Sequence, residues 1–428
     1  MNNRHCGLAA SSGRSSWRRA RGWRYLWVAA LLASPLPAFA QLVMTAAGNA
    51  QYEYNSNVFD LQNGFATPFG GKDFGDSYVA YGGKLDASYL WSRQQFYATV
   101  LGTEYRYDRL TELDHSEYNF DAGWDWKLGR LWDGVLDVNR IRTMVSFYNL
   151  IGTSLVVQTE QRETGRAGLQ FTPDWRAELT GYTRTVDQPQ PDAPNLRLTE
   201  SSGTGAVKYN GTAGVTAGLT AGYLRGSFRD TGAFVAPSYH QTTGGFTATD
   251  EVTGLSTFRG EVGYSRRTSD NGNNKVSGVT GDLNYKRALT GKTSVELDLT
   301  RQINSYVTND ASEIDSIATL SATWQATYRI GVVLGYTFTY RQLPGQGNEV
   351  VNGVFVLDGG EQTQRLHMPA LTVTYAPVHW LILKPYYHYQ TRSSENLVGG
   401  NFDASVVGVQ FTLQWDRGVI PPRTPLYY

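Results

Sequence analysis

The chain has 428 residues, with 38 basic against 38 acidic residues, one cysteine, and a heavy aromatic load of 27 Tyr, 17 Phe and 11 Trp. One cysteine excludes a disulfide framework within the chain. The balanced charge gives no case for nucleic acid as a partner. No stretch beyond the N-terminal forty residues reaches ~18 consecutive apolar residues, so the sequence predicts no membrane-spanning helix.

The first forty residues, 1–40, are predicted to be a secretory signal peptide. They contain six arginines and no acid, then a short apolar run over 25–33, then the small-x-small site Ala38-Phe39-Ala40. Cleavage is expected before Gln41, which removes Cys6, the only cysteine. Losing the six arginines takes the 38 basic residues to 32 against 38 acidic ones, a formal net charge of −6.

From about Gly48 to Trp415, apolar and polar residues alternate in segment after segment. In the stretch 118–128, for example, one face would carry Tyr118, Phe120, Ala122, Trp124, Trp126 and Leu128. Because side chains of a strand point alternately to opposite faces, each such segment has one apolar and one polar wall. We count about 18 segments of this kind, an even number, as single-chain bacterial barrels have.

The connections between these segments alternate between long and short, which favours a transmembrane barrel over a soluble sandwich. Long connections include 56–76 and 342–361, which we expect at the cell surface, and short ones include 92–93 and 129–130. The predicted fold is all-β: an antiparallel transmembrane β-barrel over 41–416, integral to the Gram-negative cell outer membrane, with no separate periplasmic domain. A proline-rich periplasmic tail would follow over 417–428, where it could plug the lumen or bind a partner.

The polar wall is expected to line a water-filled lumen, because charges are costly against lipid. We predict that this wall mixes both signs of charge with aromatic side chains. The expected lumen-wall residues are Lys84, Asp86, Glu104, Arg106, Asp121, Asp125, Arg176, Glu178, Glu261, Glu296, Asp298, Lys384, Tyr386 and His388. Inward aromatic rings, among which we place Phe96, Tyr182, Phe228 and Tyr386, could stack on sugars or could simply fill the wall.

No catalytic, cofactor-binding or metal-binding residues are predicted. The six histidines are scattered without ligand spacing. Carboxylates two or four residues apart share a face of a strand, as Glu296 and Asp298 would, and could suggest a glycosidase pair. Every lumen wall shows such pairs, however, so we read them as wall residues.

Three stretches resemble a known family: Tyr52-Glu53-Tyr54-Asn55-Ser56-Asn57-Val58-Phe59, Ser92-Arg93-Gln94-Gln95-Phe96, and the Trp-x-Trp hairpin from Trp124 to Gly134. They are similar to strand-end and turn motifs of the EpsL-like outer-membrane β-barrels of exopolysaccharide operons, grouped with β-barrel porins. Ser92 and the proline-rich tail depart from that pattern. The resemblance implies export of an exopolysaccharide. The expected partners are the exported polysaccharide, outer-membrane lipids, the outer-membrane assembly machinery and, because no periplasmic domain is predicted, separate periplasmic polysaccharide-export and co-polymerase proteins.

Two other functions stay open. A general or substrate-selective diffusion porin for small solutes would have the same walls. An outer-membrane enzyme acting on lipid or glycan would need a compact Ser/His/Asp constellation at one rim, which the sequence does not provide in any evident form. The pattern names neither the solute nor the direction of transport, nor whether the barrel is a monomer or a trimer.

Overall fold

The computed structural model describes residues 40–62, 74–147, 153–189, 196–211, 214–230, 238–253, 255–270, 275–305, 312–344, 348–351, 354–357, 361–395 and 400–417. The predicted signal peptide, apart from Ala40, and the predicted tail from residue 418 lie outside the described residues. Within these ranges, no helix is long and apolar enough to span a membrane.

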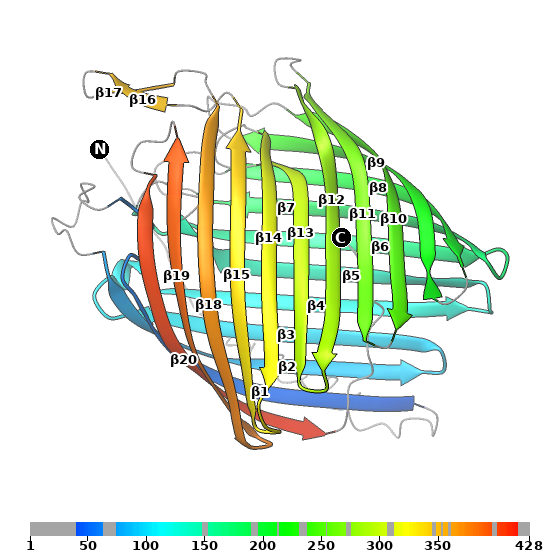
Figure 1. Cartoon of the computed structure of the whole chain (residues 1–428), viewed down its shortest axis with the longest axis horizontal. Coiled ribbons are helices and arrows are strands. Elements are labelled where there is room, and N and C mark those ends of the chain that lie inside the picture. The colour runs from blue at the N-terminus through cyan, green and yellow to red at the C-terminus, as the bar shows by residue number, and fades with distance from the viewer. Residues whose placement is uncertain are drawn as a thin grey trace, which may run out of the picture. The chain divides into compact units, whose positions relative to one another are not determined.

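Eighteen strands form one antiparallel sheet, in which each strand pairs with its neighbour in chain order. The first strand also pairs with the last, from Met44 opposite Arg417 to Asn55 opposite Val406, so the sheet closes on itself (Figure 1). The predicted 18-stranded barrel is thereby confirmed. Its strands are β1 Ala40–Asn55, β2 Asp76–Trp91, β3 Gln94–Tyr107, β4 His115–Leu128, β5 Trp132–Met144, β6 Val157–Gln170, β7 Trp175–Gln188, β8 Leu196–Asn210, β9 Thr216–Asp230, β10 Tyr239–Thr253, β11 Ser256–Ser269, β12 Lys275–Thr290, β13 Thr293–Ser305, β14 Ser312–Gln325, β15 Ile330–Leu343, β18 Gln362–Val378, β19 Leu381–Glu395 and β20 Phe402–Arg417.

Three short elements lie in the long connections. The 3-10 helix η1 (Thr111–Leu113) lies between β3 and β4, and the hairpin of β16 (Asn348–Val351) and β17 (Val354–Leu357) lies between β15 and β18. We call the end of the barrel with the long connections the loop end and the opposite end the turn end. In bacterial barrels the long loops face the outside.

Tight turns close the hairpins at the turn end. Ser92 and Gly129 both adopt a positive φ, of 57° and 61°, as short hairpin loops require. The guanidinium of Arg93 donates a hydrogen bond to the Gly129 carbonyl and so joins two neighbouring turns. The Arg-Gln and Trp-x-Trp segments noted in the sequence therefore have a structural role here, because Trp124 donates its indole N–H to Gln94 at 3.0 Å.

The outward face is apolar and exposed over the middle of the strands, with Leu219 69% and Leu179 64% accessible. Exposed tryptophans gather toward the turn end, together with Tyr209, Tyr328 and Tyr375, whereas the other exposed tyrosines lie from mid-strand to the loop end; aromatic girdles of this kind are typical of a barrel in a bilayer. The tryptophans are Trp91, Trp132, Trp175, Trp324, Trp380 and Trp415, and the tyrosines include Tyr54, Tyr81, Tyr223, Tyr264, Tyr336 and Tyr387. The chain is an integral outer-membrane β-barrel.

The inward and outward faces of strand β3 are the reverse of those predicted. Phe96 lies opposite Tyr89 and stacks on Trp124 at 5.7 Å on the outward face, so its expected inward position is wrong. Tyr97 instead points inward and donates its hydroxyl to Asp137 at 2.6 Å. The ring of Tyr97 lies over Gly123, where a Cβ would collide with it. A tyrosine can satisfy its hydroxyl on an inward carboxylate, so alternating tyrosines alone do not identify the lipid face.

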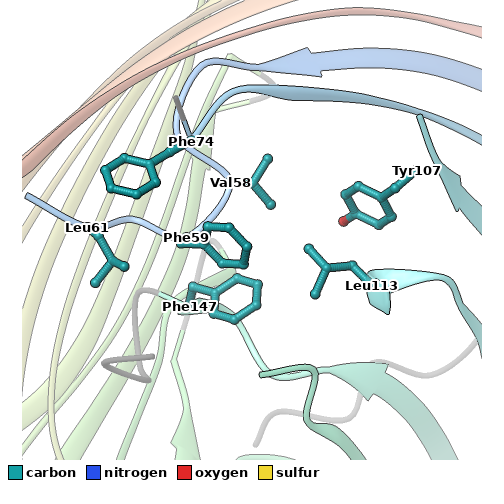
Figure 2. Close-up of a cluster of buried hydrophobic side chains, with 7 residues drawn as sticks. All are labelled: Val58, Phe59, Leu61, Phe74, Tyr107, Leu113 and Phe147. Atoms are coloured by element: carbon teal, nitrogen blue, oxygen red, sulfur yellow. The ribbon is translucent and has the colours of Figure 1, made fainter. Parts of the chain in front are cut away.

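Hydrophobic side chains from the long connections form a buried cluster at the loop end, which we call the loop cluster. It comprises Val58, Phe59, Leu61, Phe74, Tyr107, Leu113 and Phe147. Figure 2 shows Phe59 facing Phe147, whose ring centroids lie 5.0 Å apart in an edge-to-face arrangement. The cluster packs against the inward tyrosines Tyr78 and Tyr105, so it lies on the inner side of the wall.

The segment after β1 is held down by the barrel itself. The Asn57 amide donates to the carbonyls of Leu61 and Asp403 at 2.9 and 3.1 Å, and Arg392 donates to the Asp60 carbonyl at 3.3 Å. Residues 57–61 are buried, so the expectation that the whole connection 56–76 is surface-exposed is wrong for this part. The residues 63–73 lie outside the described residues.

Candidate functional site

Ion pairs run along the inner wall close to the loop end of their strands, and we call this arrangement the charged band. Arg184 on β7 donates two hydrogen bonds to Glu160 on β6, at 2.7 and 2.8 Å, and a third to Glu200 on β8 at 3.0 Å. This is the bidentate geometry in which a guanidinium binds a carboxylate most strongly. Glu200 also accepts the hydroxyl of Tyr239 from β10.

The charged band continues on β11, β14 and β15. Arg267 lies 4.4 Å over the Tyr239 ring and donates to Gln241 at 2.9 Å and to the Ile303 carbonyl at 2.8 Å. Arg341 on β15 pairs with Asp315 at 2.9 Å and with Glu313 at 3.3 Å on β14. Arg267, Arg341, Asp315 and Glu313 are almost fully buried, and the two carboxylates neutralise Arg341 within the wall.

A cavity of about 920 Å³ lies beside the charged band and is lined by residues of β5 to β15. On the turn-end side of the charged band, the lining of the cavity includes Glu261 on β11 and Asp282 on β12, which lie directly opposite each other on neighbouring strands. Both are exposed. Glu261 accepts a hydrogen bond from Thr220 at 3.2 Å, and Asp282 accepts one from Thr300 at 2.7 Å. Like charges directly opposite on neighbouring strands are unfavourable, so this pair attracts cations.

Twelve of the fourteen expected lumen-wall residues lie on the inward face of the barrel. The strand registers put these residues on the same face as the buried polar groups. They are Lys84, Asp86, Asp121, Asp125, Arg176, Glu178, Glu261, Glu296, Asp298, Lys384, Tyr386 and His388. Whether a solute contacts them stays a prediction.

Several of these residues are brought together into small networks. Arg176 pairs with Asp133 at 2.7 Å and with Glu178 at 3.4 Å, and Glu178 also pairs with Lys208 at 3.1 Å. The amide of Asn284 donates to both Glu296 and Asp298. Lys84 pairs with Asp86 at 2.9 Å. The basic groups in these networks are therefore paired with wall carboxylates.

Glu104 and Arg106 do not line the lumen. Glu104 lies opposite the outward Tyr81, and Arg106 lies opposite the outward Val79, so both point outward. Arg106 pairs with Glu104 at 2.6 Å and with Asp114 at 3.2 Å. The prediction failed because β3 turns the opposite set of alternate residues toward the lumen. The outward charges are tolerated because they lie near the loop end, where side chains reach the headgroup region.

The structure also shows groups that the sequence did not single out. His115 stacks on Tyr105 with ring centroids 4.7 Å apart, and its Nε2 lies 3.4 Å from Glu117. Its Nδ1 contacts the Leu113 carbonyl at 2.7 Å, so the ring connects η1 to the wall. Among the described residues, no group of three or more His, Cys, Asp and Glu side chains could hold a metal ion.

No family model matches the chain, and no curated protein matches it either. Among solved structures, the outer membrane protein opdK from Pseudomonas aeruginosa is similar over 87% of this chain and 99% of its own, at 10% identity and a TM-score of 0.47. OccK2 (OpdF) from P. aeruginosa covers 87% and 98%, at 11% identity and a TM-score of 0.48. The siderophore receptor PirA from P. aeruginosa covers 87% and 80%, at 9% identity and a TM-score of 0.46.

Proposed function

We propose that this barrel is a substrate-selective diffusion channel for small polar solutes, and that it passes cations and neutral solutes faster than anions. The observation that carries the proposal is the division of charge on the inner wall. Arg184 and Arg341 are committed to ion pairs within the wall, whereas Glu261 and Asp282 are exposed in the cavity and are held by threonine hydroxyls.

The size of the expected effect follows from the charges. A unit charge 4 Å from one carboxylate gains about 1 kcal/mol in water and about 4 kcal/mol at an effective dielectric constant of 20. Two adjacent carboxylates at one level of the lumen therefore favour a cation over an anion by several-fold or more. The loop cluster supports a channel for small solutes, because its side chains occupy the inner side of the wall at the loop end.

The proposal is tested by the ion selectivity of the purified protein in a planar lipid bilayer. Under a potassium chloride gradient, the zero-current potential should have the sign of a cation-selective pore. The variant Glu261→Gln with Asp282→Asn should move this potential toward zero. Glu104→Gln removes an acid from the outward face and should leave it unchanged. An anion-selective wild type, or a double variant with unaltered potential, contradicts the proposal.

Export of an exopolysaccharide is the second candidate function. It is supported by the family resemblance and by half-buried inward tyrosines near the β1–β20 closure. Tyr386 donates its hydroxyl to Glu53, and Gln51 donates to both Tyr386 and Tyr78. With the hydroxyls engaged, the ring faces could stack on sugars. Loss of surface polysaccharide from a clean deletion strain would favour this function, and normal polysaccharide with slower uptake of small cations would favour the diffusion channel.

A further inference from the structure

Strands β12 and β13 separate before either of them ends. Their pairing runs from the turn up to Gly281 opposite Arg301. Beyond that point β12 continues to Lys275, paired only with β11, and β13 continues to Ser305, paired only with β14. In Figure 1 the upper part of β13 curves toward β14 while β12 continues upward. The backbone pairing of the wall is therefore interrupted between 275–280 and 302–305. We call this interruption the slit; side chains close it, because Val276, Ile303 and Arg267 around it are at most 6% exposed.

Two hollows lie on opposite sides of the wall beside the slit. One is the lumen cavity of about 920 Å³, and the other is a groove of about 650 Å³ on the outward face, lined by residues of β10 to β15. Six residues line both: Glu261, Thr280, Gly281, Asp282, Thr300 and Arg301. Five of the six lie on β12 and β13 at or next to the last paired positions, so the lumen cavity and the groove lie back to back there, separated by one layer of wall.

The outward groove matches a hydrocarbon chain that ends in an anionic head. Its apolar lining comprises Phe246, Phe258, Val262, Val279, Leu283, Leu299 and Phe338. Arg301 lies on the outward face toward the loop end and donates to the Ser316 hydroxyl. A chain lying below Arg301 would point toward the bilayer centre, with its head at the level of the outer headgroups.

The inner side of the slit is polar. Arg267 reaches from β11 past β12 and donates to the Ile303 carbonyl on β13 at 2.8 Å. The Thr280 hydroxyl contacts Ser265 on the inner wall at 2.8 Å. A polar head at the slit thus meets guanidinium and hydroxyl groups, with Glu261 and Asp282 on the inner side toward the turn end, while its tail stays in the apolar groove.

We propose that the slit is a lateral portal between the lumen and the outer leaflet, and that it accepts a single-tailed anionic amphiphile with its tail in the groove and its head at Arg301. This function goes beyond the diffusion of small polar solutes. It does not depend on the cation selectivity of the lumen, because the side chain of Arg301 points outward whereas those of Glu261 and Asp282 point inward.

The portal is tested by reaction of a single inward cysteine with a maleimide dissolved in the membrane. The chain beyond the predicted signal peptide has no cysteine, so Thr280→Cys supplies one at the slit. Thr180→Cys is the matched control, because Thr180 points inward from β7 where pairing with β8 is continuous. With excess glutathione in the water, dodecyl maleimide should label the cysteine at 280 at least several-fold faster than the one at 180.

Further measurements test the route and the ligand. A small hydrophilic maleimide without glutathione should label both cysteines at similar rates, which shows that both barrels are folded and open. Adding Ala318→Trp fills the groove from the lipid side and should slow only the dodecyl maleimide. Dodecyl phosphate should protect the cysteine at 280, and Arg301→Gln should remove this protection. Equal labelling of 280 and 180 by dodecyl maleimide, at any level, overturns the portal, and protection unaffected by Arg301→Gln overturns the assignment of the head.

Discussion

Replacing Arg341 with methionine should destabilise the barrel severely, because it leaves two carboxylates uncompensated in the wall. Arg341 lies 2.9 Å from Asp315 and 3.3 Å from Glu313, and all three side chains are at most 10% exposed. Removing one partner of a buried ion pair costs about 3–5 kcal/mol. The control Arg197→Met removes a half-exposed pair with Asp187 at 3.3 Å, whose loss costs roughly 0–1 kcal/mol.

The free energy of unfolding is measured by equilibrium urea titration of the barrel refolded in lipid vesicles, followed by tryptophan fluorescence. Arg341→Met should lower the free energy of unfolding several-fold more than Arg197→Met does. Adding Glu313→Gln and Asp315→Asn to Arg341→Met should recover most of the loss, since no buried charge then remains at this position. Equal costs for the two arginine variants, or a triple variant no more stable than the single one, would refute the electrostatic reasoning.

Two other variants examine the loop cluster and the lipid face. Phe59→Ala should raise single-channel conductance and lower stability by about 3–5 kcal/mol. Phe246→Ala on the outward face should leave conductance unchanged. Equal conductance in the wild type and both variants would show that the loop cluster does not narrow the lumen at the loop end. Leu297→Arg should block assembly, because an arginine near the bilayer midplane costs about 2–4 kcal/mol. The neighbouring Glu296→Gln should assemble, and heat-modifiability on gels scores both variants. Equal assembly of the two would mean that the inward and outward faces of β13 are reversed.

Alternation along the chain predicted the barrel because one wall of each strand meets lipid and the other meets water. This constraint repeats in every strand, and a closed barrel leaves no edge to interrupt it. It fails on β3, where tyrosines occupy alternate positions. Tyr97 points inward to Asp137, although a ring of the same type points outward at Tyr81. The amphipathic character of tyrosine makes either face acceptable.

The candidate site could be predicted only in part. Alternation identifies inward carboxylates such as Glu261 and Asp282, but not that they lie directly opposite each other, because register depends on the turns between strands. The pairing of Arg184 with both Glu160 and Glu200 spans three strands and leaves no local pattern. The loop cluster was missed because Phe59 and Phe147 come from irregular connections, where hydrophobic residues have no period.

The central claim is that the lumen passes small polar cations and neutral solutes faster than anions. Liposome swelling with lysine, glutamine and glutamate tests it most directly, since these solutes are similar in size and differ in net charge. The wild-type barrel should give rates in the order lysine, glutamine, glutamate, and Glu261→Gln with Asp282→Asn should reduce the difference between lysine and glutamate. Fastest swelling with glutamate, or an order unchanged by the double variant, would contradict the account.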